Sequence, residues 1–189
     1  MDPLRLFVAL EIPNEIRSAL AVFLKELRGI TPQAKWVRAE NLHVTLKFLG
    51  ETEAVRVSAI ESALASIRSA EPVAMEFRGL GFFPNDRRPR VFWAGMEGSA
   101  NLKPLAEDID HSLHQLGFPL EDRPFAPHLT LARFNPPGLP PKLASVVTEH
   151  SSRTFGSLIA REFHLVESNL KSTGAEYTSL KSFPFVAET

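Results

Sequence analysis

The sequence predicts an α+β protein with antiparallel sheets, and two observations lead to this prediction. Short runs with apolar residues at alternate positions, typical of strands, are interspersed with hairpin signals and with stretches whose apolar residues have helical spacing. An offset of 85 residues also relates residues 42–49 to residues 127–134, and residues 5–9 to residues 90–94. The chain therefore contains a diverged internal duplication.

The duplication predicts how the domain is organised. With 189 residues and 44% hydrophobic content, the chain can bury a full core and has the length of one domain. We expect residues 1–189 to form a single two-lobed domain whose copies start near residues 4 and 89. The two pseudo-symmetric lobes would each hold antiparallel sheet with flanking helices. A groove between the lobes would hold the functional residues.

The first copy is predicted to alternate strand and helix. Proline, glycine and threonine stand at positions where they commonly start or end helices. In chain order, the predicted elements are a strand over residues 4–10, a helix that follows Pro13 and that Gly29 ends, a short strand over residues 35–37, a strand over residues 42–49 that Gly50 closes, and a helix over residues 57–67 that Thr52 caps.

The second copy is predicted to repeat this order and to add strands at its end. Hairpin signals and a run rich in proline and glycine separate its elements. The predicted elements are strands over residues 73–83 and 90–96 around a turn at 84–86, a helix over residues 102–116 that Asn101 caps and Gly117 ends, a strand over 127–134, a loop over 135–141, a helix over 143–150, and strands over 157–170 and 176–186 around a turn at 172–174.

Each copy carries a histidine and a threonine two positions apart in a run typical of strands. The pairs are His43 with Thr45 and His128 with Thr130. Residues two apart in a strand point to the same face, while the apolar residues between them pack behind. An imidazole can transfer a proton near neutral pH, and a hydroxyl can bind an oxyanion without carrying charge. Facing pairs would form an acid, a base and an anion clamp.

Composition excludes several functional classes. The chain has no Cys, which rules out disulfides, thiol nucleophiles and thiolate metal sites. No secretory leader pattern and no apolar run of ~18 residues is present, so we expect a cytoplasmic protein without membrane contact.

A formal net charge of −1 excludes a broad nucleic-acid-coating surface, so any RNA contact should be short and local. Small basic groups that could hold a strand end are Lys35 with Arg38, Arg87 with Arg88 and Arg90, and Arg123 with Arg133.

Three segments of the chain together resemble one enzyme family. They are residues 5–10 (RLFVAL), 42–50 (LHVTLKFLG) and 127–133 (PHLTLAR). They resemble the RNA 2′,3′-cyclic phosphodiesterases, also called the 2′-5′ RNA ligase family, which belong to the two-histidine phosphoesterase superfamily. Residues 167–170 and 174–177 are also similar to that family, so the resemblance covers nearly the whole chain.

The resemblance implies a bilobal α+β fold and hydrolysis of a terminal RNA 2′,3′-cyclic phosphate to a 2′-phosphomonoester. It also implies reversible 2′-5′ ligation of RNA ends without a nucleotide cofactor. By position, it implies His43 as proton donor, His128 as proton acceptor, and Thr45 and Thr130 on the non-bridging phosphate oxygens. The residues alone leave the acid and base roles interchangeable. Arg133 is a further candidate phosphate contact, although its odd offset from Thr130 predicts the opposite strand face unless the strand twists or ends there.

Two other functions stay open at this stage. One is a sister activity on another cyclic phosphate, such as a small nucleotide or an ADP-ribose derivative. The other is a non-catalytic RNA-end binding module, which two titratable histidines argue against. We expect a monomer without metal or cofactor. One helix holds acidic and histidine residues that imitate a metal cluster, but they lie off its apolar stripe and predict a solvated face; they are Asp108, Asp110, His111 and His114.

Overall fold

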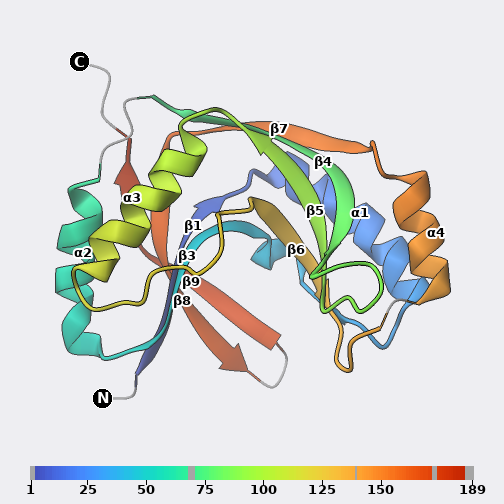
Figure 1. Ribbon diagram of the computed structural model, residues 1–189, viewed down its shortest axis with the longest axis horizontal. Helices are drawn as coiled ribbons and strands as arrows, with labels where there is room; N and C mark the ends of the chain where they lie inside the picture. Colours follow the sequence, from blue (N-terminus) through green and yellow to red (C-terminus); the bar gives the residue numbers. More distant parts are fainter. Residues whose placement is uncertain (1–2, 68–70, 139, 172–173, 186–189) are drawn as a thin grey trace.

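The protein is built on one antiparallel sheet that curls between two groups of helices (Figure 1). The computed structural model describes residues 3–67, 71–138, 140–171 and 174–185. In chain order, the elements are β1 (Leu4–Glu11), α1 (Asn14–Ile30), β2 (Lys35–Trp36), η1 (Ala39–Asn41), β3 (His43–Thr52), η2 (Ala54–Arg56), α2 (Val57–Ala65), β4 (Val73–Phe83), β5 (Val91–Gly98), α3 (Leu102–His114), β6 (His128–Arg133), α4 (Pro141–Glu149), β7 (Thr154–Ala160), β8 (Glu162–Lys171) and β9 (Gly174–Pro184). The predicted α+β class with antiparallel sheet is confirmed.

The sheet divides into two lobes where β3 meets β6. Its strand order is β7-β4-β5-β6-β3-β1-β8-β9, with β2 beside β6. We call β3, β1, β8 and β9 the His43 lobe, and β6, β5, β4 and β7 the His128 lobe. Their strands meet at the register pair of Val44 and Leu129. Helices α2 and α3 pack on the His43 lobe, and α1 and α4 on the His128 lobe (Figure 1).

The two lobes are interlocked because each carries one helix from each copy of the duplicated unit. Helix α3 belongs to the second copy and packs against β3 of the first, while α1 belongs to the first copy and packs against β7. One cluster of buried apolar side chains runs through both lobes. The apolar stripes predicted for α1 and α3 face this cluster, and each large side chain so buried contributes roughly 1.5–3 kcal/mol to folding. This arrangement favours a single domain.

The pairing of the strands follows the duplication. β5 pairs with β6 as β1 pairs with β3, and β4 flanks β5 as β8 flanks β1. Thr45 lies opposite Ala9, and Thr130 lies opposite Trp93. Ala9 and Trp93 are 84 positions apart, so the predicted offset of 85 is one residue too long for β1 and β5. Over residues 7–9, offsets of 84 and of 85 both match apolar residues with apolar residues, so the sequence does not reveal this shift.

The strand predicted over residues 157–170 is wrong, because the chain forms two strands there. β7 ends at Ala160 and pairs with β4, whereas β8 begins at Glu162 and pairs with β1. The two strands therefore lie in different lobes. Residues 157–170 contain no proline or glycine that would signal a break, and strand periodicity does not reveal a change of pairing partner. The turn predicted at 172–174 includes residues 172–173, which lie outside the described residues.

Several predicted helix ends are also corrected. Thr52 does not cap α2, because it ends β3 and its hydroxyl donates to the Gly50 carbonyl. Gly29 does not end α1, which continues to Ile30. Asn101 precedes α3 but makes no side-chain cap; its amide donates to the Glu71 carbonyl instead. A cap prediction from residue type ignores such competing partners.

Gly50 and Gly117 are two of the glycines whose backbone has a positive φ. Gly50 has φ 73° and lies within β3, which continues to Thr52 rather than closing there as predicted. Gly117 has φ 88° and follows the last turn of α3, as predicted. Both are left-handed conformations that other residues rarely adopt. Within the described part of the chain, no helix has the length and apolar character that crossing a membrane requires.

Candidate active site

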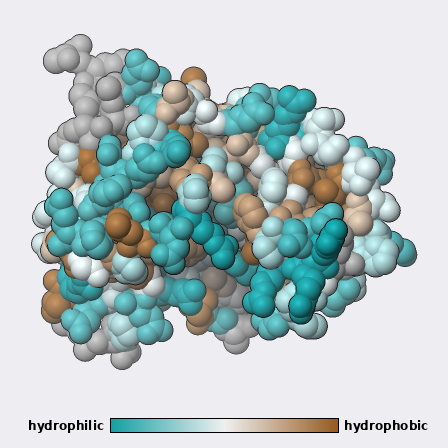
Figure 2. All heavy atoms as spheres, viewed as in Figure 1, coloured by the Kyte–Doolittle hydropathy of each residue, from teal (hydrophilic) through white to brown (hydrophobic). Residues whose placement is uncertain are grey.

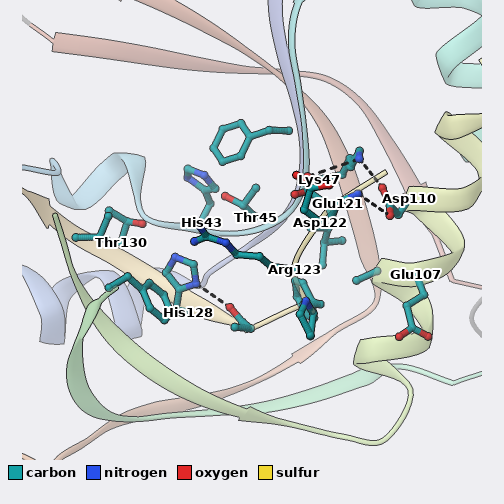
Figure 3. Close-up of a pocket in the computed structure, with 18 of the residues that line it drawn as sticks. His43, Thr45, Lys47, Glu107, Asp110, Glu121, Asp122, Arg123, His128 and Thr130 are labelled. Atoms are coloured by element: carbon teal, nitrogen blue, oxygen red, sulfur yellow. Dashed lines mark hydrogen bonds and ion pairs between the residues drawn. The ribbon is translucent and has the colours of Figure 1, made fainter. Parts of the chain in front are cut away.

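The two histidines and two threonines predicted from sequence lie in one pocket between the lobes. His43 and Thr45 come from β3, and His128 and Thr130 come from β6 (Figure 3). The pocket has a volume of about 920 Å³, which is more room than a single phosphate needs. The predicted groove between the lobes is thus present, and it is lined by both motif pairs.

A β-bulge at the same place in both motif strands sets which side chains face the pocket. The register shifts past Leu46 in β3 and past Leu131 in β6. The bulged leucine and the residue after it are both buried, so the alternation is reset. Arg133 consequently lines the pocket with Thr130, although its odd offset predicted the opposite face. Its counterpart in β3 is Phe48, which also lines the pocket.

Each catalytic candidate has its ring held by a backbone carbonyl two residues earlier. His43 Nδ1 lies 2.7 Å from the Asn41 carbonyl, and His128 Nδ1 lies 2.8 Å from the Ala126 carbonyl. A carbonyl only accepts, so each Nδ1 carries the hydrogen and donates it. In the neutral ring this leaves Nε2 with a free lone pair. Both histidines are therefore prepared to take or give a proton at Nε2.

Burial makes both rings neutral in the empty pocket. The pKa of His43 is lowered from 6.5 to about 4, mainly by loss of hydration and also by the positive charges of Arg17 and Arg133, while the bond to the Asn41 carbonyl opposes the shift. Loss of hydration is also the main cause that lowers the pKa of His128, with Arg133 adding to it. An anion bound between the rings would oppose these effects because it stabilises imidazolium.

Aromatic rings pack against both histidine rings. The ring of His43 lies 4.6 Å from that of Phe7 and 5.1 Å from that of Tyr177, whereas the ring of His128 lies 5.0 Å from that of Phe83. The contacts with Tyr177 and Phe83 are edge-on. Burial raises the pKa of Tyr177, so its hydroxyl stays protonated and can donate a hydrogen bond.

Arg123 is a site residue that the sequence did not single out as one. It lines the pocket and extends from the loop before β6 toward the histidines (Figure 3). In the sequence, Arg123 stands out only as part of a small basic group with Arg133. The duplication offered a signal, because Arg38 precedes His43 by five positions as Arg123 precedes His128. Arg38 itself pairs with Glu40 at 2.7 Å.

A buried lysine on β3 anchors the loop that carries Arg123. Lys47 is only 2% exposed, pairs with Asp110 on α3, and donates to the Pro119 carbonyl. Asp110 in turn accepts from the Glu121 backbone amide. Asp110 therefore does not lie on a solvated face, as the sequence predicted, because a buried cation competes for it. Within the described segments, no group of three potential ligands is arranged to hold a metal ion.

The chain is similar in sequence to a known protein family and to named proteins. The family model described as LigT like phosphoesterase matches residues 10–93 and 96–177. A protein of Archaeoglobus fulgidus named RNA 2′,3′-cyclic phosphodiesterase is 38% identical over 95% of this chain and 99% of its own length. One of the same name from Thermus thermophilus is 36% identical over 98% of this chain and 92% of its own.

The chain is also similar in fold to solved crystal structures. A crystal structure of a Thermus thermophilus protein has a TM-score of 0.78 and 33% identity, and covers 96% of this chain and 97% of its own. Escherichia coli LigT complexed with 3′-AMP has a TM-score of 0.76 and 28% identity, over 98% of this chain and 99% of its own.

Proposed function

Because the chain belongs to the LigT-like phosphoesterase family, we propose that it hydrolyses the terminal 2′,3′-cyclic phosphate of RNA to a 2′-phosphomonoester, with His43 and His128 as its acid–base pair. The relatives from Archaeoglobus and Thermus bear the name of this activity. One observation carries the proposal for this chain. Two imidazoles with carbonyl-held Nδ1 atoms share a pocket with two threonines and two arginines.

The reaction proceeds by in-line attack of water on the cyclic phosphorus. As the water oxygen bonds to phosphorus, the neutral Nε2 of one histidine takes a water proton. The bond from phosphorus to the 3′ oxygen breaks, and the other histidine, as imidazolium, protonates that oxygen. Each such proton transfer contributes typically 10²- to 10⁴-fold in rate. The family resemblance makes His128 the acceptor and His43 the donor.

The pKa values are compatible with that division of roles once the phosphate is bound. Burial lowers the pKa of His43 to about 4, so its imidazolium is a strong acid toward the leaving oxygen. It is seldom protonated in the empty pocket. The negative charge of the cyclic phosphate raises the pKa of both rings, and one proton can then be shared by the pair.

The hydroxyl and guanidinium groups of the pocket stabilise the charge on phosphorus. Thr45 and Thr130 donate to the two non-bridging oxygens, which gain negative charge in the transition state. Arg133 and Arg123 add positive charge from the His128 side and from the loop before β6. Donors arranged in advance act more strongly than water, which must reorient as charge develops.

The same groups can serve 2′-5′ ligation. If the 5′ hydroxyl of a second RNA replaces water, the histidine pair activates that hydroxyl and protonates the same leaving oxygen. One phosphate ester bond forms as another breaks, so no nucleotide cofactor is required. In the reverse reaction the two histidines exchange roles, so that the former proton donor accepts a proton and the former acceptor donates one.

Three substrates separate this function from the two other candidates. We expect turnover of a short RNA with a 2′,3′-cyclic phosphate end, in EDTA as well as without it, because imidazoles already fill the roles of acid and base. Faster turnover of a cyclic phosphate on ADP-ribose or on a small nucleotide would instead favour the sister activity. Binding of the RNA without turnover would favour a binding module. Loss of activity in EDTA with recovery on one divalent ion would contradict the metal-independent mechanism.

A further inference from the structure

The loop between β4 and β5, residues 84–90, presents three arginines beside the pocket that the acid–base chemistry does not use. We propose that this loop, which we call the basic hairpin, binds phosphates of the RNA strand on the 5′ side of the terminal cyclic phosphate. The inference rests on the proposed function and adds the direction in which the substrate lies. The side chains concerned are Arg87, Arg88 and Arg90, all exposed.

The basic hairpin begins where the pocket ends. The last register pair of β4 and β5 joins Phe83 and Val91, and both residues line the pocket. Pro84, the first residue of the loop, lines it too. The ring of Phe83 lies edge-on to His128 at 5.0 Å. A strand whose terminal phosphate sits at His128 therefore reaches the loop within its next few nucleotides.

The backbone of the basic hairpin is held in place before any ligand binds. The side-chain oxygen of Asn85 accepts from the backbone amides of Arg87 and Arg88, both at 3.1 Å. The amide of Arg90 donates to the Phe83 carbonyl at 2.8 Å, and the Arg90 carbonyl accepts from the Phe134 amide at 2.9 Å. A loop held in this way loses little conformational entropy on binding, so more of the interaction shows as affinity.

The arginines of the basic hairpin have their charges available. Across the described segments, none of the three lies within ion-pair distance of a carboxylate. Residues 84–90 hold these three cations and one acid, Asp86, in a chain whose formal net charge is −1. Figure 2 shows a strongly hydrophilic patch over this loop. The basic surface continues through Lys35, which lies opposite Arg133 in the β2–β6 pair.

Charge at the other end of the pocket disfavours the opposite direction of the RNA strand. That end is lined by Glu107, Glu121 and Asp122, on α3 and the loop after it (Figure 3). These carboxylates repel phosphate, whereas the basic hairpin attracts it. An RNA strand consequently leaves the catalytic histidines across β4 and β5. If the charges of the basic hairpin served only solubility, the effect of removing them on kcat/KM would not depend on RNA length.

A length series tests the proposal. The substrates are a nucleoside 2′,3′-cyclic monophosphate and oligoribonucleotides of two, four and eight nucleotides with the same cyclic end. For Arg87→Ala/Arg88→Ala, kcat/KM should fall on the order of tenfold on the longest RNA, through KM, and less than about twofold on the mononucleotide. The slope of log(kcat/KM) against log salt should decrease by about 1.4, since each phosphate contact on a single strand contributes roughly 0.7.

Two matched variants complete the experiment. Arg87→Lys/Arg88→Lys keeps the charge and should recover most of the length dependence. Lys25→Ala/Lys142→Ala removes the same charge from exposed positions on α1 and α4 and should leave it unchanged. An unaltered length dependence in the Arg87→Ala/Arg88→Ala protein, or an equal loss in the Lys25→Ala/Lys142→Ala protein, would overturn the proposal.

A binding measurement distinguishes failure of this proposal from failure of the proposed function. Fluorescence anisotropy of an eight-nucleotide RNA that ends in a 2′-phosphomonoester, the proposed product, measures binding by wild-type protein and by Arg87→Ala/Arg88→Ala without turnover. If wild type hydrolyses none of the substrates, the catalytic proposal fails. Weaker binding by the variant still supports the hairpin in that case, and equal binding refutes it.

Discussion

The two motif strands share the groups that we propose to act on phosphate, and they differ in the residues after the bulge. Both hold a histidine by a carbonyl, present a threonine to the pocket, and bulge at corresponding leucines. Next to the bulged leucine, β3 has the buried Lys47 and β6 has Ala132. Lys47 fixes the loop before β6 through Asp110, whereas Ala132 only packs in the core. Both copies thus present a histidine and a threonine to the pocket, while Lys47 of the first copy also holds the loop before β6 of the second.

The next position differs in charge. Phe48 and Arg133 occupy corresponding places in the pocket, and Phe48 is 51% exposed. One lobe therefore offers apolar surface and the other a cation. Burial lowers the pKa of both His43 and His128, and Arg133 adds to the lowering at each. The difference teaches that two similar lobes can give unlike environments to identical histidines, which acid–base catalysis requires.

Replacing either histidine should have the largest effect. His43→Ala and His128→Ala should each lower turnover of a cyclic-ended RNA by about 10²- to 10⁴-fold, because each removes one proton transfer. The double variant should be scarcely slower than either single variant, since the pair acts as a unit. Single-turnover rates measure this. Circular dichroism should give wild-type spectra for all three variants, and a folded single variant with near wild-type turnover would contradict the mechanism.

The threonines should matter less and should matter similarly. Thr45→Ala or Thr130→Ala should cost roughly 10- to 10³-fold in kcat, because a donor to developing charge is lost. Thr45→Ser and Thr130→Ser serve as controls, since they keep the hydroxyl. Steady-state kinetics on the same RNA measure both effects. If only one of the two alanine variants were impaired, the two threonines would not have equivalent roles.

Breaking the Lys47 anchor should chiefly affect stability. Lys47→Met leaves Asp110 without its cation, and the partial exposure of Asp110 limits the loss to about 2–4 kcal/mol of unfolding free energy. Lys47→Met/Asp110→Asn should recover part of this because the one carboxylate that then lacks its cation, Glu121, is exposed to solvent. Urea denaturation gives both values. Equal stability of Lys47→Met and wild type would mean that the ion pair does not hold the loop.

The pH dependence should show the smallest but most specific effect. The productive form has one neutral and one protonated imidazole, and both pKa values in the empty pocket lie below 6.5. The profile of kcat/KM, which reports the free protein, should therefore be a bell with its maximum below pH 6.5. The profile of kcat should peak at higher pH, because bound phosphate raises both pKa values. Two coincident profiles centred at or above pH 7 would refute the burial argument.

The sequence predicted the central residues of the site because they are carried by a short repeat. His43, Thr45, His128 and Thr130 share a face in an ordinary strand, so period-two alternation was enough to group them. Arg133 was predicted as a candidate phosphate contact, but its odd offset from Thr130 favoured the opposite face unless the strand twists or ends there. A bulge adds one residue to the strand, and no local residue type signals that addition.

Long-range contacts account for what else was missed. Lys47 lies 63 positions from Asp110, and a lysine in a motif strand reads as solvent-exposed until the partner is known. The split between β7 and β8 depends on which strands they pair with, β4 and β1, and periodicity carries no such information. Fold class and motif faces follow from local pattern, whereas anchors and strand partners depend on the assembled sheet.

The most direct test of the two-histidine mechanism is the identity of its product. A defined oligoribonucleotide ending in a 2′,3′-cyclic phosphate would be incubated with wild-type protein, and the product separated against synthetic 2′- and 3′-phosphate standards. An acid fixed on one wall protonates a single ribose oxygen, so we predict the 2′-phosphomonoester alone. A mixture of the two products, or a predominant 3′-phosphate, would contradict the account.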